Sequence, residues 1–333
     1  MTSGTGEESE EERSLLEAVH LVKRFGSFAA VDDISFDLRR GEIFGFLGPN
    51  GAGKTSTINM LTGLAKPTSG RVYLDGVEYS GNPKLAQASM GIVQDESNLY
   101  DELDGFENLC FCGALYGMER SVREARAREL LAQFALVEAG KRPFRAYSKG
   151  MKRKLTIAAA IIHRPTILFL DEPTTGIDVA SARQIRALIA ELNRAGTTVF
   201  LTTHYIEEAE RLCRRVAFIV RGKIVHSGTL DELAREQQQK YVLEVVCDEA
   251  GLKSLEALRT RFPQFKLSRP DSQRFRVVSE LPIDLLPLLT EVAESGTIVT
   301  EAKLVRPSLE EVFVAVTGIE SGAMKQEREG KKQ

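Results

Sequence analysis

The chain has 333 residues and a formal net charge of -3. This length is enough for one large domain and a smaller one, and the near-balanced charge argues against a protein that binds nucleic acid by neutralising its phosphates. The longest strongly apolar stretch, near residues 155–162, is far shorter than the ~20 residues that a membrane helix needs, so we do not expect the chain to cross a bilayer.

The amino-terminal residues 1–14 are polar and acidic, which predicts a disordered tail and differs from the basic and then apolar pattern of a signal peptide. Two of the four cysteines, Cys110 and Cys112, form a C-x-C pair that has no matching second pair. A zinc site is therefore not expected. We interpret the cysteines as buried or free thiols in a reducing cytoplasm.

A β-rich stretch is expected next, with strands at residues 18–23, 31–39 and 71–74 between glycine-containing turns. Within it, the apolar run IFGFL at residues 43–47 predicts a buried parallel strand. A further strand is expected at residues 90–93. We therefore expect the chain to open with sheet structure rather than with helices.

The loop after strand 43–47 reads GPNGAGKT and fits the phosphate-binding pattern G-x-x-x-x-G-K-[ST]. Its small residues let successive backbone N–H groups turn toward phosphates, and the helix expected at residues 54–61 presents its positive end to the same anions. Lys54 is expected to reach the outer phosphates and assist catalysis, and Thr55 is expected to ligate magnesium. The residues predicted to hold the nucleotide here are Gly48, Pro49, Asn50, Gly51, Ala52, Gly53, Lys54, Thr55 and Ser56.

An apolar run at residues 167–170 predicts a central strand that ends in Asp171 and Glu172. The carboxyl ends of such strands form ligand sites in α/β sheets, which places both carboxylates beside the phosphate loop. Asp171 is then expected to bind magnesium, and Glu172 to act as the general base that polarises a water toward the γ-phosphate. Together, the two motifs predict a protein that binds and hydrolyses a nucleoside triphosphate.

Residues 102–162 are mostly helical in pattern, and helices and strands alternate after Asp171, which indicates a parallel sheet covered by helices. The elements expected there are helix 179–194, strand 197–202, helix 205–213 and strands 215–221 and 223–227. A polar linker at residues 236–240 then precedes a small α+β domain, 241–318. Its expected strands are 241–247, 275–278 and 297–299, its expected helices are 252–262, 283–294 and 308–316, and residues 319–333 are expected to form a disordered tail.

Residues 147–151 read YSKGM and directly precede a helical pattern. The chain here resembles the ATP-binding subunits of ABC transporters, whose signature is typically LSGGQ or, in one branch, YSGGM. The resemblance runs from about Ala18 to Leu233 and covers the family's motifs in order. It implies an ABC-type ATPase cassette of the α/β class at residues 15–236, with a RecA-like parallel sheet core, an antiparallel β subdomain and a helical subdomain at about 98–162.

The resemblance also implies roles for single residues, each of which has a simpler alternative. Phe25 matches the aromatic residue that stacks on adenine, and the alternative is a turn aromatic that packs on the β-rich lobe. Gln94 matches the glutamine that senses magnesium and water, and the alternative is an ordinary polar loop residue. His204 matches the switch histidine, against a cap or core histidine. Asp178 matches the D-loop aspartate, against a helix N-cap, and these two roles are compatible.

A serine hydroxyl, a backbone N–H at Gly150 and a helix N-terminus form a second anion site around Ser148. In the family this site lies far from the phosphate loop of its own chain, so two cassettes pair head to tail and each ATP lies between one partner's loop and the other's signature. Lys149 stands where the family usually has a glycine, and a positive φ there would be strained. Two consequences of Lys149 are considered, a weaker second site and an added cation near the γ-phosphate. We expect the site to work because Ser148 and Gly150 are retained. The neighbouring Lys152-Arg153-Lys154 cluster is interpreted as a solvated helix face.

The apolar, helical stretch at residues 98–118 lies where the family docks a short helix of its membrane permease. The alternative is that its large apolar residues belong to the core of the helical subdomain, and these are Leu109, Phe111, Leu115 and Tyr116. The end of the C-terminal domain, SLEEVFVAVTG, resembles the ABC-2-type branch that serves drug, polysaccharide, sodium or cofactor exporters. The resemblance thus implies a peripheral protein at the cytoplasmic face of a membrane, with ATP and Mg²⁺ as its ligands.

Two other classes of function compete with this one. Soluble ABC ATPases that act on ribosomes or DNA usually carry two cassettes in one chain or a long coiled-coil insertion, and this chain has neither feature. A GTPase or small-molecule kinase shares the phosphate loop, but no Asn-Lys-x-Asp guanine reader is present, and the YSKGM motif is unexplained by that function. We therefore expect a transport ATPase with no nucleic-acid partner, whose cargo is selected by a different polypeptide.

Overall fold

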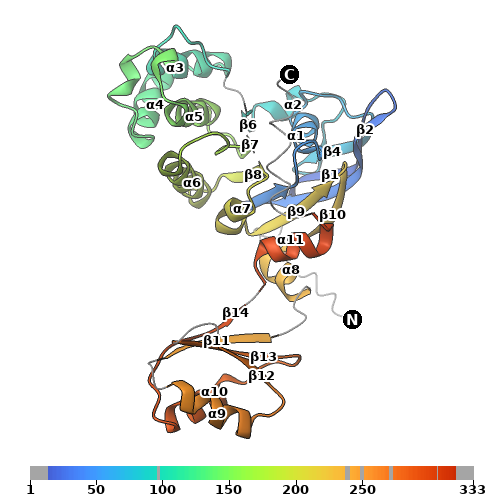
Figure 1. Cartoon of the computed structure of the whole chain (residues 1–333). Helices are drawn as coiled ribbons and strands as arrows, with labels where there is room; N and C mark the ends of the chain where they lie inside the picture. Colours follow the sequence, from blue (N-terminus) through green and yellow to red (C-terminus); the bar gives the residue numbers. More distant parts are fainter. Residues whose placement is uncertain are drawn as a thin grey trace, which may run out of the picture. The chain divides into compact units, whose positions relative to one another are not determined.

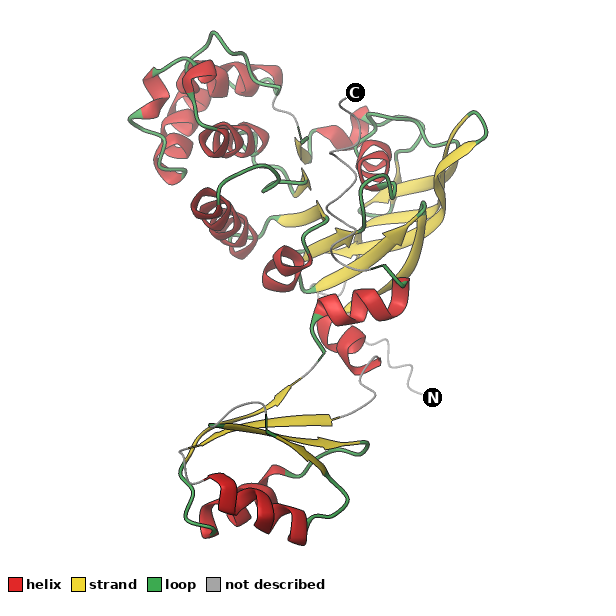
Figure 2. Cartoon of the chain, in the orientation of Figure 1, coloured by secondary structure: helices red, strands yellow, loops and turns green. Residues whose placement is uncertain are grey.

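The computed structural model describes residues 14–95, 98–236, 241–247, 251–269, 273–305 and 307–319. Its helices and strands (Figure 2) belong to two compact units (Figure 1). The first unit runs to Leu230 and resumes at Val316, and the second is Asp231–Ala315. The chain passes between the units within α8 (Leu230–Glu236) and within α11 (Leu309–Thr317).

The tails and the linker expected from the sequence lie almost entirely outside the described residues. Of the tail expected at 1–14, only Ser14 is described, and it is the first residue of β1. Of the linker expected at 236–240, only Glu236 is described, at the end of α8. Of the tail expected at 319–333, only Ile319 is described.

The first unit contains a four-stranded antiparallel sheet with the order β2-β1-β4-β5. β1 and β2 form a hairpin in which Phe25 pairs with Phe28 across a turn at Gly26, whose φ of 59° favours glycine. All three strands expected here are present, and β1 and β2 are longer than expected because their pairing runs from Ser14 opposite Arg39 to Phe25 opposite Phe28. The strands are β1 (Ser14–Phe25), β2 (Phe28–Arg39), β4 (Ser69–Leu74) and β5 (Val77–Glu78).

A six-stranded sheet with the order β10-β9-β3-β8-β7-β6 forms the centre of the unit. Five of its strands pair in parallel, and β10 closes one edge as an antiparallel hairpin with β9. β3, β7 and β8 are buried at every position, as expected of central parallel strands. The strands are β3 (Ile43–Leu47), β6 (Met90–Val93), β7 (Ile167–Asp171), β8 (Thr198–Thr203), β9 (Arg215–Val220) and β10 (Lys223–Thr229).

Aromatic side chains join the two sheets into one core. Phe36 of β2 lies with its ring centroid 5.8 Å from that of Phe44 in β3 and 5.9 Å from that of Phe200 in β8. The helices that follow the strands of this unit are α1 (Lys54–Leu61), α2 (Lys84–Gln87), α6 (Val179–Arg194) and α7 (Ile206–Leu212). The expected parallel sheet with covering helices is therefore confirmed, and α1 and α6 have the bounds predicted from the sequence.

The helical subdomain of the first unit is formed by α3 (Gly105–Leu115), α4 (Arg120–Gln133) and α5 (Lys149–Ala160), which pack against one another. Short 3-10 turns at Ala139–Lys141 and Phe144–Ala146 lead from α4 to α5. A capping box between Asp104 and Glu107 begins α3. None of the described helices is long and apolar enough to span a membrane.

The second unit has the element order strand, helix, two strands, helix, strand, which is the split β-α-β arrangement of ferredoxin-like folds. Its antiparallel sheet has the order β12-β13-β11-β14, and α9 and α10 pack together on one face (Figure 1). The strand expected at 297–299 is wrong, because the chain pairs with β11 over the later residues of β14. The elements are β11 (Tyr241–Cys247), α9 (Gly251–Arg261), β12 (Lys266–Ser268), β13 (Arg274–Ser279), α10 (Leu285–Glu294) and β14 (Val299–Val305).

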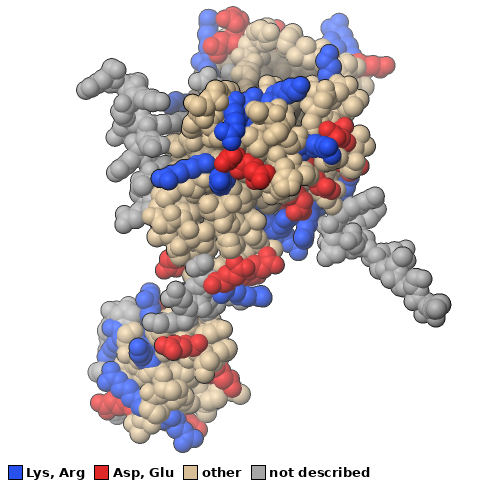
Figure 3. All heavy atoms as spheres, turned by 90° about the vertical axis from the view of Figure 1, so that its right-hand side faces the viewer, with Lys and Arg blue, Asp and Glu red and all other residues tan. Residues whose placement is uncertain are grey.

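Charged side chains of both signs are mixed on the face of the first unit that Figure 3 shows. Asp32 lies between two cations, with Arg24 at 3.5 Å and Lys223 at 3.3 Å. Arg40, directly after β2, pairs with Asp75 in the turn after β4. In these pairs a basic group is neutralised by an acidic neighbour from another strand or turn.

Candidate functional site

Glycine is required at two positions in the loop between β3 and α1. A Cβ atom on Gly48 would lie 2.1 Å from the carbonyl oxygen of Ile219, and one on Gly53 would lie 2.4 Å from that of Ala30. Gly53 has a φ of 110° and is the N-cap of α1. Because glycine has no side chain, it does not cap the first N–H groups of that helix. The first N–H groups of α1 therefore fit the binding of phosphate oxygens, as the sequence predicts.

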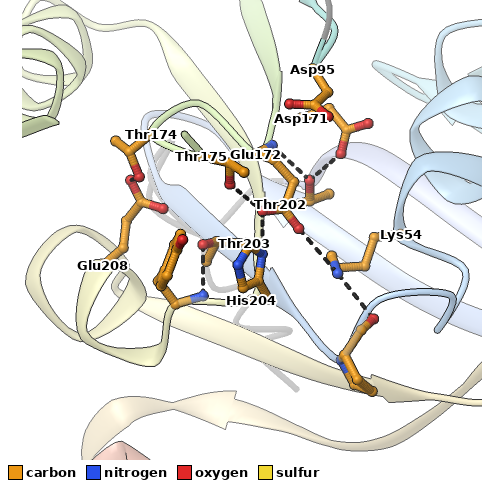
Figure 4. A network of polar contacts seen from close by, with 12 residues as sticks. Lys54, Asp95, Asp171, Glu172, Thr174, Thr175, Thr202, Thr203, His204 and Glu208 are labelled. Carbon is orange, nitrogen blue, oxygen red and sulfur yellow. Dashed lines mark hydrogen bonds and ion pairs between the residues drawn. The ribbon is translucent and has the colours of Figure 1, made fainter. Parts of the chain in front are cut away.

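Lys54 is buried at the start of α1 and is held by the loop itself. Its Nζ donates hydrogen bonds to the carbonyl oxygens of Gly48 at 2.7 Å and Pro49 at 3.1 Å. The same ammonium lies 3.2 Å from Oε1 of Glu172 at the end of β7. The structure thus brings the phosphate loop and the predicted general base into direct contact (Figure 4).

Asp171 and Thr55 lie together, as expected of magnesium ligands. Thr55 Oγ1 donates a hydrogen bond to Asp171 Oδ2 at 2.8 Å, and Thr202 Oγ1 donates one to Asp171 Oδ1 at 2.5 Å. Burial raises the pKa of Asp171 above its ordinary value, and the hydrogen bonds from the two threonines oppose that rise. A carboxylate beside a threonine hydroxyl offers the hard oxygen ligands that Mg²⁺ prefers.

Glu172 is held by three partners and has an unusual backbone. Its φ of 51° lies in the left-handed region, which is uncommon for a residue with a side chain. Oε2 lies 2.5 Å from His204 Nδ1 and accepts a hydrogen bond from Thr175 at 2.7 Å, while Oε1 faces Lys54 (Figure 4). Burial alone would raise the pKa of Glu172, but the His204 hydrogen bond and the Lys54 charge lower it to about 2.

His204 contacts the predicted general base. It lies directly after β8, is 8% exposed and has its ring against Glu172 rather than at a helix cap, a position that fits the switch histidine of the family. The threonines Thr175 and Thr202, which hold the two carboxylates, were missed by the sequence analysis. A signal existed for Thr202, because a polar residue near the carboxyl end of an otherwise buried strand faces the ligand edge of the sheet.

Gln94 is not joined to the magnesium pair by any hydrogen bond among the described residues. Its Oε1 accepts a hydrogen bond from Asn98 Nδ2 at 2.8 Å. The following residue, Asp95, does line the nucleotide pocket and is drawn beside Asp171 in Figure 4. The loop after β6 therefore reaches the site, with the glutamine side chain turned toward Asn98.

A pocket of about 410 Å³ connects these groups to two aromatic rings. Phe25 and Phe28, at the tip of the β1–β2 hairpin, are 57% and 63% exposed and form its apolar end. An exposed ring beside a phosphate loop fits stacking on a base better than packing in the β-rich lobe. Phe28 was missed by the sequence analysis. The lining residues are Phe25, Phe28, Ala30, Asn50, Gly51, Gly53, Lys54, Thr55, Ser56, Asp95, Asp171 and Glu172.

The signature residues lie at the start of α5 and do not line this pocket. Ser148 is the N-cap of α5, and its Oγ accepts a hydrogen bond from the N–H of Met151 at 3.3 Å. Lys149 is the first helical residue and has no positive φ, so the strain considered for it is absent. Gly150 is needed for packing, because a Cβ there would lie 2.5 Å from Ser181 Oγ in α6.

Asp178 is the N-cap of α6, as its simpler alternative predicts. Its Oδ1 accepts a hydrogen bond from the N–H of Ser181 at 2.9 Å. The interpretation of Lys152-Arg153-Lys154 as a solvated helix face is wrong for Arg153, which is 8% exposed. Arg153 points inward because it shares one side of α5 with buried residues three and four positions away, Gly150 and Ile157.

The proposed docking stretch, 98–118, divides into core and surface. Leu109 is fully buried and belongs to the core of the helical subdomain. Phe111, Leu115 and Tyr116 are 39%, 71% and 43% exposed, so the core alternative is wrong for these three. Tyr116 stacks on His163 with ring centroids 3.5 Å apart.

Comparison with known proteins agrees with this geometry. The sequence model of the ABC transporter family matches residues 31–175. The chain is 37% identical to the doxorubicin resistance ATP-binding protein DrrA of Mycobacterium tuberculosis, over 88% of this chain and 89% of that protein. It is 36% identical to the Nod factor export ATP-binding protein I of Ralstonia nicotianae, over 92% and 94% of the two chains.

Solved structures show the same fold. A dimeric ATP-binding cassette in a post-hydrolysis state, bound to ADP and phosphate, superposes with a TM-score of 0.60 at 26% identity, over 65% of this chain and 98% of that one. The antiparallel sheet, the parallel core and the helical subdomain are therefore those of an ABC cassette, as the resemblance implied. The chain belongs to the ABC transporter family and is one of its ATP-binding, ATP-hydrolysing subunits.

Proposed function

We propose that two copies of this chain bind two Mg²⁺–ATP at the cytoplasmic face of a membrane and power a separate permease that exports a drug, lipid, polysaccharide or ion. The observation that carries the proposal is that the residues expected to bind one ATP lie in two separate places on the chain. One pocket contains the phosphate loop, Asp171 and Glu172, whereas Ser148 lies outside it. The export direction and the class of cargo are supported by the relatives named for doxorubicin resistance and for Nod factor export.

Within one chain, different residues bind different parts of the nucleotide. Phe25 stacks on adenine, and the loop from Gly48 to Ser56 holds the phosphates. Thr55, Asp171 and Gln94 would hold Mg²⁺ directly or through water, and the bound ion would neutralise charge on the phosphates.

Glu172 acts as the general base, and its two basic neighbours set its strength. Burial would raise the pKa of Glu172, but the hydrogen bond with His204 and the ammonium of Lys54, 3.2 Å from the carboxylate, keep it low. A γ-phosphate that attracts Lys54 removes the second of these effects, so the pKa of Glu172 rises and the carboxylate becomes a stronger base. His204, in contact with the same carboxylate, orients it toward the water.

The two halves of each site come together in a head-to-tail dimer. The partner contributes Ser148 and Gly150 to the γ-phosphate and Asp178 to the interface, so ATP holds the dimer closed and hydrolysis opens it. Glu172→Gln should therefore bind ATP and remain a closed dimer, measured by light scattering after size-exclusion chromatography. A variant that stays monomeric with ATP, or that hydrolyses ATP at the wild-type rate, would contradict this proposal.

A groove on the first unit offers a place for the permease. It has a volume of about 710 Å³ and an apolar wall that includes Tyr116, Met118 and Val122. Phe111 and Leu115 of α3 are also exposed, and apolar residues that face solvent favour docking of a short amphipathic helix. We assign this task and ATP hydrolysis to residues 15–236, and an accessory role to residues 241–318.

Co-purification tests the transport function. The full chain, expressed with its native neighbours and extracted in mild detergent, should bring down a multi-helix membrane protein. Leu115→Glu should lose that partner and keep its ATPase activity, whereas Val137→Glu, at another exposed apolar position of the same subdomain, should retain the partner. Recovery of ribosomes or nucleic acid in place of a membrane protein would support the soluble ATPase alternative.

A further inference from the structure

Arg153 connects the signature helix to the loop after β6. It lies in the second turn of α5 and is 8% exposed. Nη1 donates a hydrogen bond to the carbonyl oxygen of Gln94 at 2.6 Å, and Nη2 donates one to that of Asp95 at 2.7 Å. Nη2 also lies 3.6 Å from Asp95 Oδ1. One side chain therefore holds two successive backbone carbonyls of the loop that enters the nucleotide pocket.

The geometry of this contact suits arginine better than lysine. A guanidinium is planar and presents its N–H donors in fixed directions, so two of its nitrogens bind two neighbouring carbonyl oxygens at once. A lysine ammonium can also bond two successive carbonyl oxygens, as Lys54 does in the phosphate loop, but it donates from one nitrogen and has no planar fork that fixes its orientation. Because Arg153 is buried, water cannot readily replace either bond, and the backbone of Gln94 must follow any movement of α5.

The other end of α5 is the signature. Ser148 is the N-cap of the helix, and Arg153 follows it by five residues, about 7.5 Å along the axis. α5 is continuous from Lys149 to Ala160, so a displacement of its N-terminus also displaces Arg153. On the far side of the contact, the hydrogen bond between Gln94 and Asn98 leads into the stretch proposed for permease docking.

We propose that Arg153 is a positioning residue that couples the ATP bound at Ser148 to Gln94 in the chain's own nucleotide site. This inference rests on the proposed head-to-tail dimer. In that dimer, each α5 contacts the partner's ATP at its N-terminus and holds the magnesium-sensing loop at its own site through Arg153. Closing one site therefore sets the geometry of the other, and the two ATP molecules are hydrolysed cooperatively.

A purely structural anchor makes a different prediction. If Arg153 only fastened the loop, its loss would lower thermal stability and ATP affinity and leave the dependence of rate on ATP concentration unchanged in form. A coupling role predicts that a single chain still binds ATP normally, because Arg153 does not line the pocket. What is lost is cooperativity and turnover, since both need the signature and Gln94 to move together.

The test uses the full chain with Arg153→Lys and Arg153→Met. Lys154→Met is the matched control, because Lys154 is the next residue of α5 but its Nζ bonds to Gln184 Oε1 in α6 at 2.6 Å. We expect both Arg153 variants to keep their affinity for a fluorescent ATP analogue within about twofold, to lose turnover by about 10–100-fold and to show a Hill coefficient near 1. Lys154→Met should retain the wild-type Hill coefficient and turnover.

Arg153→Lys is included because it keeps the charge and most of the length of the side chain, so it should fold even if Arg153→Met does not. Wild-type turnover and cooperativity in Arg153→Lys, or an equal loss in Lys154→Met, would overturn the proposal. In a Glu172→Gln background, both Arg153 variants should still dimerise with ATP. If Glu172→Gln alone does not dimerise, the proposed function fails first, so the two failures are distinguishable.

Discussion

Replacing Glu172 with glutamine keeps the shape of the side chain and removes its charge. That charge has three partners in the structure: Lys54 at 3.2 Å from one oxygen, and His204 at 2.5 Å and Thr175 at 2.7 Å from the other. A glutamine that turns its oxygen toward Lys54 directs its NH₂ group at two groups that donate to the carboxylate. We expect ATP hydrolysis to fall by about 10²–10⁴-fold, the usual contribution of a general base.

The same substitution should lower the stability of the protein by an amount that the site itself supplies. Burial raises the pKa of Glu172, yet its hydrogen bonds and the Lys54 charge lower it from 4.5 to about 2. This difference of about 2.5 in pKa, at about 1.36 kcal/mol for each pKa unit, corresponds to about 3 kcal/mol. Because the folded-state pKa is the lower one, the stabilisation is complete above pH 4.5 and is lost as the pH falls toward 2.

Urea unfolding without nucleotide, followed by circular dichroism, measures this effect. At pH 7 the variant should be less stable than the wild type by about 3 kcal/mol, and at pH 3 the difference should shrink to less than half of that value. Glu207→Gln is the control, because the side chain of Glu207 is 83% exposed and its ion pair with Arg211 is long, at 3.9 Å. Its substitution should change the free energy of unfolding by less than about 0.5 kcal/mol. A difference that is absent at pH 7, or that does not depend on pH, would refute the reasoning.

Three further predictions concern neighbouring groups. Phe28→Ala should raise the KM for ATP about tenfold with little change in kcat, because it removes one of the two rings at the apolar end of the pocket; steady-state kinetics test this. Gly150→Ala should reduce ATPase activity, because the added Cβ forces α5 away from Ser181, and Ser181→Gly in the same chain should restore the activity. A double variant as inactive as the single variant would argue that this contact is not the cause. Since burial raises the pKa of Asp171, the ATPase activity should fall on the acid side at a higher pH than it would with an ordinary carboxylate. A higher Mg²⁺ concentration should shift this loss of activity to lower pH, because the metal competes with the proton for the carboxylate. An acid-side loss of activity that does not depend on Mg²⁺ would argue against Asp171 as a metal ligand.

Local signals predicted much of the fold. The strand at 43–47 and the helices at 54–61 and 179–194 have the predicted bounds, because an apolar run, a phosphate loop and an N-capping aspartate each mark an end within a few residues. The strand expected at 297–299 shows the limit of such signals. β14 runs over Val299–Val305 because pairing with β11 decides its position, and its charged residues hide the alternation in the sequence.

The candidate site shows the same division. The spacing of the motifs predicted that Lys54 and Asp171 lie near each other, but no pattern shows that Glu172 has a positive φ or that Lys54 contacts it. Arg153 was assigned to solvent because it stands between two lysines. Its helical spacing to Gly150 and Ile157 was the signal that places it inside, since residues three and four positions apart share a helix face.

Under the proposed mechanism, hydrolysis depends on two separate events. Arrival of the phosphates would draw Lys54 from Glu172 and strengthen the base, but would leave Gln94 turned toward Asn98. Engagement of the partner's ATP would move α5 and, through Arg153, the backbone of Gln94. Because neither event alone completes both the base and the magnesium-sensing loop, ATP bound to an unpaired chain should turn over slowly, and the rate should rise with the square of the chain concentration while pairing is incomplete.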